Sequence, residues 1–341
     1  MRAARLHEYG EVLHLDDVPT PELRGHHDVI VRIGGAGVCR TDLHIVEGML
    51  RGLVEAELPY TLGHENAGWV EAVGDAVSSV RVGDAVIVHP AITCGVCAGC
   101  QRGEDMYCSQ QQMPGFNTDG GFAEYLRTTE RALVALPQSL RPADVAPYAD
   151  AGLAAYRAVK KAARHLQAGQ SVAVIGVGGL GHIAVQALHA LTPATVIALD
   201  RSEPALDLAR DLGVEHVVTA DDQAAETVRE LSGGGVNAVL DFVGEQDTPA
   251  QAIAMLGPGG SYYVIGYGGR LDVPLADLLA REISIVTNLV GTHTELEELI
   301  ALAAAQKVRL ETQTYPLSNI NDALETLNQG KLRGRAVITP G

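Results

Sequence analysis

Four of the five cysteines lie in one short loop with the spacing CxxCxxCx7C: Cys94, Cys97, Cys100 and Cys108. Four thiolates this close in the chain can surround a Zn²⁺ ion tetrahedrally, so that sulfur fills every coordination position and none is left for a substrate. Residues 93–108 are therefore predicted to hold a structural zinc ion.

The fifth cysteine, Cys39, stands far upstream of Cys94 and is followed at a distance by Gly63, His64 and Glu65. A thiolate and an imidazole can belong to an incomplete zinc shell, which leaves one coordination position open for chemistry. Taken alone, Cys39 is equally well explained as an inert core thiol, and His64 as a buried, hydrogen-bonded histidine. The residues by themselves leave both interpretations open.

A glycine-rich turn, GVGGLG at 176–181, indicates a dinucleotide site. It contains Gly176, Gly178, Gly179, Leu180 and Gly181, and it lies directly between a predicted strand (171–176) and a predicted helix (180–191). In such a turn the pyrophosphate approaches bare backbone at a helix N-terminus. The alternative is that these glycines are only structural.

Asp200 ends the next predicted strand after the glycine turn. A carboxylate at this place accepts hydrogen bonds from the adenosine ribose and repels a 2′-phosphate, which favours NAD over NADP. Arg201 is a candidate for the adenine side of the site, or else a solvated arginine. Asp200 could likewise be a solvated strand end.

The sequence predicts two regions of different secondary structure that position these residues. Residues 1–148 contain short β-type runs separated by Gly, Pro and Asp, at 28–38, 67–74, 84–90 and 123–130, and this predicts a compact barrel or sandwich. From about residue 150, strands alternate with helices, with strands at 171–176, 195–200, 216–220, 238–244 and 262–268 and helices at 180–191 and 204–212. That alternation predicts an α/β fold with a doubly wound parallel sheet.

The C-terminal segment, 288–341, carries two helix signals and a strand. One helix is expected to start at a capping box formed by Thr294 and Glu297, and the other lies near 318–329. The final strand, RAVITP, is expected to pack back on the first domain.

Composition limits the possible functions. A chain of 341 residues with 47% apolar residues is long enough for two cores. A net charge of −17 without a basic run argues against a nucleic-acid partner. The apolar stretch 172–191 contains four glycines, His182, Gln186 and His189, so no membrane span is expected. The start of the chain resembles neither an export nor a transit segment, and thiols free to bind metal suit the cytoplasm.

Several motifs together resemble the zinc-containing medium-chain alcohol dehydrogenases. They are CRTDLH (39–44), GHENAGWVEAVGDAV (63–77), the four-cysteine loop and GVGGLG, in the order and spacing of that family and over essentially the whole chain. The DAGL run at 150 is most similar to the bacterial secondary-alcohol branch. The resemblance implies a GroES-like catalytic domain at 1–150 that includes the zinc loop, a Rossmann NAD-binding domain at 151–287, and a C-terminal segment, 288–341, that returns to the catalytic domain.

The resemblance also implies roles for individual residues. Cys39, His64 and Asp150 take the places of the catalytic zinc ligands, with Asp150 where liver-type enzymes have a cysteine, so that the chain would bind two zinc ions in all. Glu65 is expected beside the metal. Thr41 and His44 match the proton relay, and Arg40 and Arg335 match basic positions at the cofactor pyrophosphate. Ala154 departs from the family, which usually has a threonine there against the nicotinamide. His89 and His182 are interpreted as structural.

The expected reaction is hydride transfer between NAD(H) and small to medium secondary alcohols or the matching ketones and aldehydes, by a homodimer or homotetramer. Leu289 and Val290 are apolar, which favours aliphatic substrates over the main alternative, a polyol or amino-alcohol dehydrogenase of the same superfamily. Zinc-free quinone or enoyl reductases should lack the cysteine loop. A zinc ribbon for nucleic acid conflicts with the acidity, and an inactive structural relative conflicts with the intact relay.

Overall fold

The computed structural model describes residues 1–52 and 56–341 and divides the chain into two compact units. Unit 1 comprises residues 1–153, 291–304 and 310–341, and unit 2 comprises residues 154–290 and 305–309. The chain passes from one unit to the other at 153/154, 290/291, 304/305 and 309/310.

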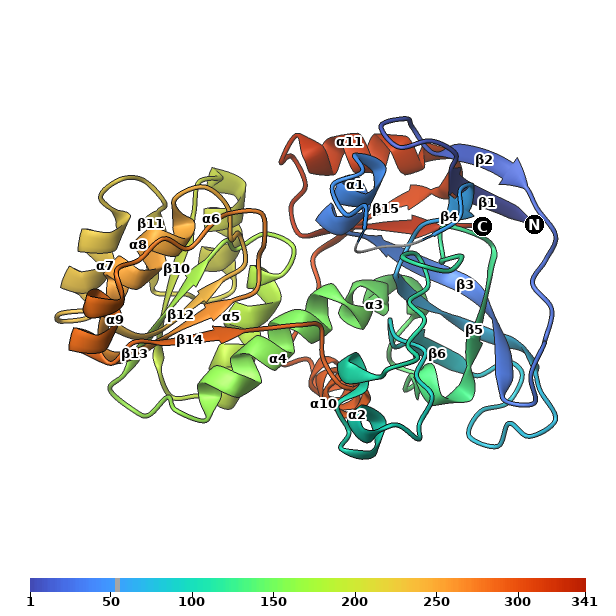
Figure 1. Cartoon of the computed structure of the whole chain (residues 1–341), viewed down its shortest axis with the longest axis horizontal. Helices are drawn as coiled ribbons and strands as arrows, with labels where there is room; N and C mark the ends of the chain where they lie inside the picture. The colour runs from blue at the N-terminus through green and yellow to red at the C-terminus, as the bar shows by residue number, and fades with distance from the viewer. Residues whose placement is uncertain (53–55) are drawn as a thin grey trace. The chain divides into compact units, whose positions relative to one another are not determined.

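Within the described part of unit 1, the largest sheet has seven strands in the order β15-β16-β3-β5-β6-β8, and β7 also pairs with β3 (Figure 1). A second sheet has the order β2-β1-β4. The strands are β1 Arg2–Leu6, β2 His14–Asp17, β3 Asp28–Val38, β4 Tyr60–Thr61, β5 Glu65–Val73, β6 Ala85–Val88, β7 Tyr125–Thr129, β8 Leu133–Ala135, β15 Thr312–Pro316 and β16 Arg335–Thr339.

Short helices connect and cover these strands. The α-helices are α1 Arg40–Val46, α2 Ala98–Gln101, α3 Pro142–Val145, α10 His293–Ala304 and α11 Ile320–Asn328, and the 3₁₀ helices are Asp105–Tyr107, Glu130–Ala132, Ala146–Ala149 and Leu317–Asn319. A helix of 13 residues, α4 Ala151–Ala163, begins in unit 1 and continues into unit 2.

β3 is the central strand of unit 1 because apolar and small residues occupy nearly all its positions, so both its faces can be covered. Val29, Val31 and Ile33 are buried in a core that also contains Leu62 and Phe122. On its two edges β3 pairs antiparallel with β5 and with both β7 and β16. The C-terminal strand β16 thus belongs to the sheet built by the first third of the chain.

The predicted capping box of α10 is wrong by two positions. Glu295, and not Glu297, accepts a hydrogen bond from the amide of Thr292 at 2.9 Å, and the Glu295 amide donates to Thr292 Oγ1 at 3.1 Å. Both Thr292-x-x-Glu295 and Thr294-x-x-Glu297 fit the capping-box pattern. Glu295 lies on the buried face of α10 together with Leu296 and Leu299, whereas Glu297 is exposed.

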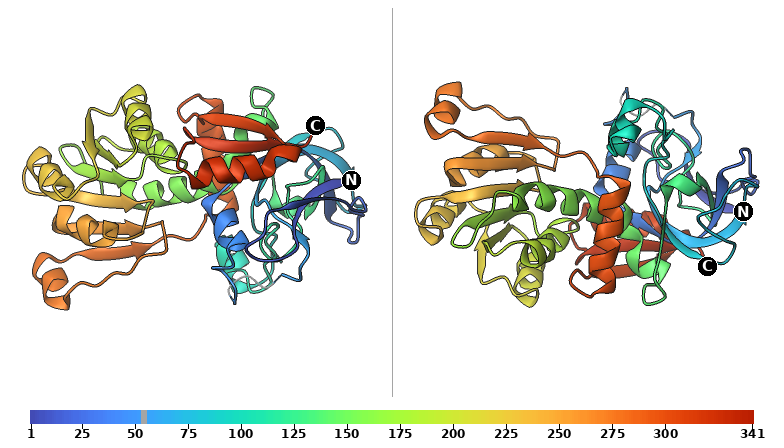
Figure 2. Two further views of the ribbon diagram at one scale, coloured as in Figure 1. Left: turned by 90° about the horizontal axis from the view of Figure 1, so that it is seen from above. Right: turned by 90° about the horizontal axis from the view of Figure 1, so that it is seen from below.

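Unit 2 is a parallel sheet with the strand order β11-β10-β9-β12-β13-β14, and helices lie on both faces of it (Figure 2). Its strands are β9 Ser171–Ile175, β10 Thr195–Asp200, β11 His216–Thr219, β12 Val236–Asp241, β13 Leu256–Val264 and β14 Ser284–Thr287, and its helices are α5 Gly181–Leu191, α6 Glu203–Asp211, α7 Ala224–Leu231, α8 Thr248–Met255 and α9 Leu275–Arg281. The predicted α/β fold class, a β-rich unit together with a doubly wound parallel sheet, is confirmed.

The order of strands across this sheet reverses between β9 and β12. In doubly wound sheets the carboxyl ends of the strands at such a reversal open a crevice where ligands bind. All five residues of β9 are buried, as expected for a central parallel strand. The apolar stretch 172–191 is therefore a strand, a turn and a helix, and no helix among the described residues has the length and apolar character needed to cross a bilayer.

Candidate functional site

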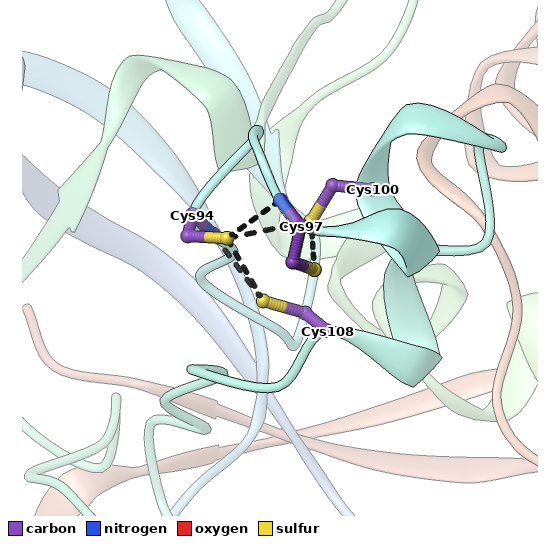
Figure 3. A group of neighbouring side chains, drawn as sticks. All are labelled: Cys94, Cys97, Cys100 and Cys108. Carbon is purple, nitrogen blue, oxygen red and sulfur yellow. Dashed lines mark hydrogen bonds between the residues drawn. The ribbon is translucent and has the colours of Figure 1, made fainter.

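The four cysteines of the 93–108 loop turn their sulfur atoms toward one another (Figure 3). Sγ of Cys94 lies 3.6 Å from Sγ of Cys108, and Sγ of Cys97 lies 3.6 Å from Sγ of Cys100. A tetrahedron with Zn–S bonds of about 2.3 Å has edges of about 3.8 Å. The spacing of the four sulfurs thus fits a zinc ion with no open position.

The surroundings of the cluster also shift the pKa values of two of its thiols. The amides of Cys100 and Ser109 donate hydrogen bonds to Sγ of Cys97 and lower the pKa of that thiol to about 5. Burial raises the pKa of Cys100 to about 11. Thiolates are the species that bind zinc, so metal binding must release the proton from Cys100.

Asp105 fastens the cysteine loop to the rest of unit 1. Its Oδ1 accepts from Nη2 of Arg131 at 3.1 Å, and its Oδ2 accepts from the amide of His293 at 3.0 Å. His293 is the first residue of α10. Asp105 therefore links the loop to the start of that helix.

A second group of candidate ligands contains Cys39, His64, Glu65 and Asp150, with one donor atom of each within 4.8 Å of the others. Cys39 follows β3, Glu65 begins β5, and the pairing of Gly37 with Glu65 in these two strands brings their ends together. Asp150 immediately precedes α4. Side chains that are far apart in sequence are thus gathered by the sheet and one helix start.

Three buried atoms in this group have no hydrogen-bond partner among the described residues. They are the two ring nitrogens of His64 and Oε2 of Glu65. Nε2 of His64 lies 3.5 Å from Asp150 Oδ2. Buried polar atoms are almost always partnered, so exceptions of this kind call for a ligand or an ion. A thiol, an imidazole and carboxylates are zinc donors, and the group therefore fits the zinc ion expected from the sequence.

The helix after Cys39 contributes a residue that the sequence interpretation missed. Asp42 is completely buried, and its Oδ2 accepts from the amide of Cys39 at 2.8 Å. Its Oδ1 lies 3.2 Å from His64 Nδ1, although the angles are not those of a hydrogen bond. The available signal was an acidic residue three positions after Cys39, which is typical of a helix N-terminus.

Glu65 is held from two sides. Its Oε1 accepts from Nη2 of Arg335 and from the amide of Ala151, the latter at 3.1 Å. A Cβ atom added at Gly37 would collide with its Oε2. Arg335, expected at the cofactor pyrophosphate, is thus a buried partner of Glu65 in this structure, and its contact with phosphate stays a prediction.

The electrostatics of the group follow from burial and close charges. Burial lowers the pKa of His64, but the carboxylates of Asp42 and Asp150 outweigh this and the pKa lies well above its usual value. Burial raises the pKa of Asp150, yet His64 and Arg335 bring it below the usual value. Burial raises the pKa of Glu65, and Arg335 only partly opposes the shift. Because a metal-bound histidine is neutral, zinc binding here is expected to release a proton.

The predicted relay residues lie on α1. Thr41 Oγ1 is 3.7 Å from Cys39 Sγ, so its hydroxyl is next to the metal group. His44 is buried one turn later, and Arg40, the first residue of the helix, is exposed. Their roles in proton transfer and phosphate binding are proposals that the geometry permits.

In unit 2, the glycine turn and Asp200 are joined by a hydrogen bond. Asp200 Oδ2 accepts from the amide of Val177 at 2.8 Å, and Oδ1 accepts from the amide of Ser202 at 2.9 Å. Gly176 has a φ of 84°, which favours glycine. A Cβ at Gly181 would collide with the carbonyl of Gly176. Close packing therefore requires glycine at two positions of the motif.

The other members of the glycine turn and the basic neighbour of Asp200 are placed as follows. Gly178 has open space where a Cβ would be, Gly179 lies between it and Leu180, and Leu180 is the N-cap of α5. Arg201 donates from Nη1 to Gln246 Oε1 at 2.9 Å. The guanidinium of Arg201 thus bonds a side chain other than the neighbouring carboxylate.

Comparisons with known proteins cover the whole chain. Residues 25–138 match the family described as alcohol dehydrogenase GroES-like domain, and residues 179–305 match that described as zinc-binding dehydrogenase. A NAD-dependent alcohol dehydrogenase of Sulfurisphaera tokodaii is 35% identical over 350 residues, covering 100% of both chains. A D-arabinose 1-dehydrogenase (NADP(+)) of Saccharolobus solfataricus is 34% identical, covering 99% of this chain and 97% of its own. The crystal structure of the alcohol dehydrogenase from the archaeon Aeropyrum pernix superposes with a TM-score of 0.97 at 51% identity, covering 100% of both chains.

Proposed function

Because the chain belongs to the zinc-containing medium-chain alcohol dehydrogenases, we propose that it oxidises small to medium secondary alcohols with NAD⁺ and reduces the matching ketones. Its cofactors are zinc and NAD. The observation that carries the proposal is the group of Cys39, His64, Glu65 and Asp150, whose donor atoms converge within 4.8 Å and include buried atoms without partners among the described residues.

Cys39, His64 and Asp150 would hold the catalytic zinc, and the four-cysteine loop would hold the structural zinc. Bound zinc supplies Lewis-acid chemistry, which makes an alcohol oxygen acidic and a carbonyl carbon electrophilic. The Cys39 thiolate and the Asp150 carboxylate balance the two positive charges of the ion. Glu65 adds a third negative charge, which the buried guanidinium of Arg335 offsets.

Two residues of α1 would move the proton that the alcohol loses. Thr41 Oγ1, beside Cys39, would accept the proton of the alcohol hydroxyl while passing on its own, and His44 would take up the proton that leaves the site. Bound NAD⁺ would supply the nicotinamide that accepts the hydride from the alcohol carbon. Both residues are expected to matter for turnover but not for zinc content.

Unit 2 would bind NAD at the glycine turn. The turn Gly176–Gly181, in which Gly178 has open space beside it, would take the pyrophosphate at the start of α5, and Arg40 and Arg335 are the proposed basic residues at the phosphates. Asp200 still has acceptor capacity beyond its bonds to Val177 and Ser202, so it can accept the ribose hydroxyls. Arg201 would lie beside the adenine.

A polyol or sugar substrate is the second candidate, and the D-arabinose dehydrogenase relative favours it. Against it stand the apolar Leu289 and Val290, which are proposed to line the substrate site. That relative is named for NADP⁺, whereas the carboxylate of Asp200 is expected to repel the 2′-phosphate of NADP⁺.

A turnover panel tests the function. Wild-type enzyme and a Cys39→Ala variant are given 2-alkanols, primary alcohols, sorbitol, threonine and D-arabinose, with NAD⁺ or NADP⁺, and with or without chelator. We expect NAD⁺-dependent oxidation of 2-alkanols that the chelator and the Cys39→Ala change abolish. Rapid oxidation of the polyols or threonine with no turnover of 2-alkanols would contradict the proposal.

The proposed assembly is a homodimer or homotetramer formed through unit 2. β14 pairs with β13 and is the last strand in the described order of the sheet, so its other edge can accept a second strand. On the adjoining helix α9, Leu275 and Leu279 are 81% and 80% exposed. Two apolar side chains one turn apart and largely exposed are typical of a covered interface. The free thiol ligands suit a reducing compartment, and we propose the cytoplasm.

A further inference from the structure

The chain passes from unit 2 to unit 1 between Val290 and Gly291. Val290 has a φ of 41°, in the left-handed region that β-branched residues rarely adopt, because the branched side chain crowds the backbone there. Strain of this kind persists only where surrounding contacts hold the backbone in place. The junction therefore needs partners that fix it.

On the unit 2 side, residues 287 and 288 are held by α4. Asn288 Nδ2 donates to the carbonyl of Ala154 at 3.1 Å. Nζ of Lys161 donates to Asn288 Oδ1 at 3.1 Å and to the carbonyl of Thr287 at 3.0 Å. These bonds end two positions before the strained residue.

On the unit 1 side, the first bond comes from a histidine that the zinc groups do not use. Nε2 of His89 lies 3.0 Å from the carbonyl oxygen of Gly291. A Cβ at Gly291 would come within 2.5 Å of Leu153 Cδ1, so the backbone at this point is also tightly packed. His89 directly follows β6, which places this contact on the rigid sheet of unit 1.

The hydrogen bonds define which nitrogen of His89 carries the proton. The Gly291 carbonyl can only accept, so Nε2 must donate. Nδ1 lies 3.2 Å from the amide nitrogen of Ala91, which can donate to it, and 3.1 Å from the carbonyl oxygen of Ala91. The side chain is 2% exposed, and burial lowers its pKa, so the ring is neutral with the proton on Nε2.

We propose that His89 is a positioning residue for hydride transfer: its Nε2–H bond to the Gly291 carbonyl holds the strained Val290–Gly291 junction. The inference rests on the proposed alcohol dehydrogenase function. Val290, at this junction, is also a proposed substrate-site residue. Loss of the bond lets Val290 relax to a negative φ and move its side chain.

Three single variants test whether His89 positions the junction for catalysis or only contributes to the stability of the fold. His89→Leu keeps bulk but loses the donor, and His89→Gln places an amide nitrogen near the Nε2 position. His293→Leu is the matched control, because His293 also bonds a backbone carbonyl, that of Leu133, at 3.0 Å, shortly beyond the junction. The measurements are kcat and KM for NAD⁺ and a 2-alkanol, zinc content and Tm.

We expect His89→Leu to lower kcat about tenfold, the effect of losing one well-made hydrogen bond, with zinc content unchanged. His89→Gln should stay within about threefold of wild type, and His293→Leu should lose Tm but keep kcat. Equal kcat in the Leu and Gln variants, or an equal fall in kcat for His293→Leu, would overturn the inference.

A double-mutant cycle with Val290→Gly tests the strain itself. Glycine adopts positive φ without a steric cost, so His89→Leu should lower kcat less than about threefold in the Val290→Gly background. Additive effects would contradict the role of the strained residue. Should His89→Leu fail to fold, His89→Asn, whose amide is one methylene too short, takes its place.

Amide hydrogen exchange provides a readout that does not need turnover. Peptides covering residues 286–292 should exchange faster in His89→Leu than in wild type or His89→Gln. Identical exchange in all three proteins would refute the inference. If wild type oxidises no alcohol while the exchange difference is present, the proposed function fails and the role of His89 at the junction does not.

Discussion

Asp42 and His64 form a completely buried carboxylate–imidazole pair in which Asp42 Oδ1 lies 3.2 Å from His64 Nδ1. The same Asp42 accepts from the amide of Cys39 through Oδ2. One carboxylate therefore contacts two of the proposed zinc ligands: Oδ1 lies close to Nδ1 of the His64 imidazole, and Oδ2 accepts a hydrogen bond from the backbone of Cys39.

Replacing Asp42 by Asn should weaken the catalytic zinc site. Partners of this kind orient metal-bound histidines, and their loss typically costs about 10- to 100-fold in metal affinity or activity. Zinc titration against a competing chelator and kcat/KM measure the change. Asp144→Asn, in an exposed pair with Arg141, is the control and should leave both unchanged. Unaltered zinc affinity in Asp42→Asn would exclude the proposed role.

Substitutions in the two cysteine groups should have different effects, one on activity and the other on thermal stability. Cys39→Ala is expected to remove one zinc per chain and abolish turnover, while Tm changes little. Cys97→Ala is expected to remove the other zinc and lower Tm strongly, because the loop fixes the start of α10 through Asp105. Elemental analysis and calorimetry of both proteins provide the test, and the assignment fails if Cys97→Ala keeps two zinc ions.

Asp200→Ala should change cofactor choice. The substitution removes the negative charge that opposes a 2′-phosphate, and it also breaks the bond to the Val177 amide in the glycine turn. We expect kcat/KM for NAD⁺ to fall about 10- to 100-fold and the preference for NAD⁺ over NADP⁺ to narrow. Asp221→Ala, at an exposed turn, is the control. An unchanged preference would show that another residue excludes NADP⁺.

Glu130 should stabilise the protein in a defined pH window. The amide of Ser78 donates to its Oε2 at 3.0 Å, and with Ser79 and His27 this lowers the pKa of Glu130 to about 2. Because the folded-state pKa is below the ordinary value of about 4.5, the stabilisation is complete above that value and is lost as the pH falls towards 2.

Urea unfolding of wild type and Glu130→Gln therefore gives a pH-dependent difference. At pH 6 the variant should be less stable by about 1.5–3 kcal/mol, the range for hydrogen bonds to a charged group. At pH 3 the difference should be smaller, since the unfolded wild-type chain then gains stability by protonating Glu130. A difference that does not change between pH 6 and pH 3 would contradict the assignment.

Leu275 and Leu279 should contribute to assembly. Changing Leu279 to Arg is expected to weaken the self-association by about 1.5–3 kcal/mol, the cost of losing one buried leucine. Sedimentation velocity over a concentration series measures the shift. Val82→Arg is the matched control, since Val82 is 63% exposed in unit 1. If both variants sediment like wild type, α9 does not form the interface.

The sequence was sufficient for the parts of the site that consist of local patterns. The four-cysteine loop and the glycine turn each occupy a short stretch of chain, and the structure brings each together as such patterns require. The family and the fold class, expected from the order of the motifs, are confirmed. The individual ligand and cofactor contacts stay predictions.

Contacts that depend on tertiary packing were beyond the sequence pattern. Arg335 pairs with Glu65 from the far end of the chain because β16 lies against β3, and no periodicity shows such a partner. Thr292 and Glu295 cap α10 where Thr294 and Glu297 fit the same pattern, and only burial of one helix face distinguishes them. β14 is short and mostly exposed, and its run of β-branched residues is a strand signal that the sequence interpretation missed.

The absence of a side chain at Gly37 limits how this enzyme can be redesigned. The position faces Glu65 Oε2, and even a methyl group there would displace the carboxylate. In a library of unit 1 variants made to widen the substrate range, any substitution of Gly37 should therefore lower the activity towards every substrate alike. Directed evolution of substrate range should therefore vary other positions, because substitutions at residue 37 would disturb Glu65 beside the proposed metal site and would not select between substrates.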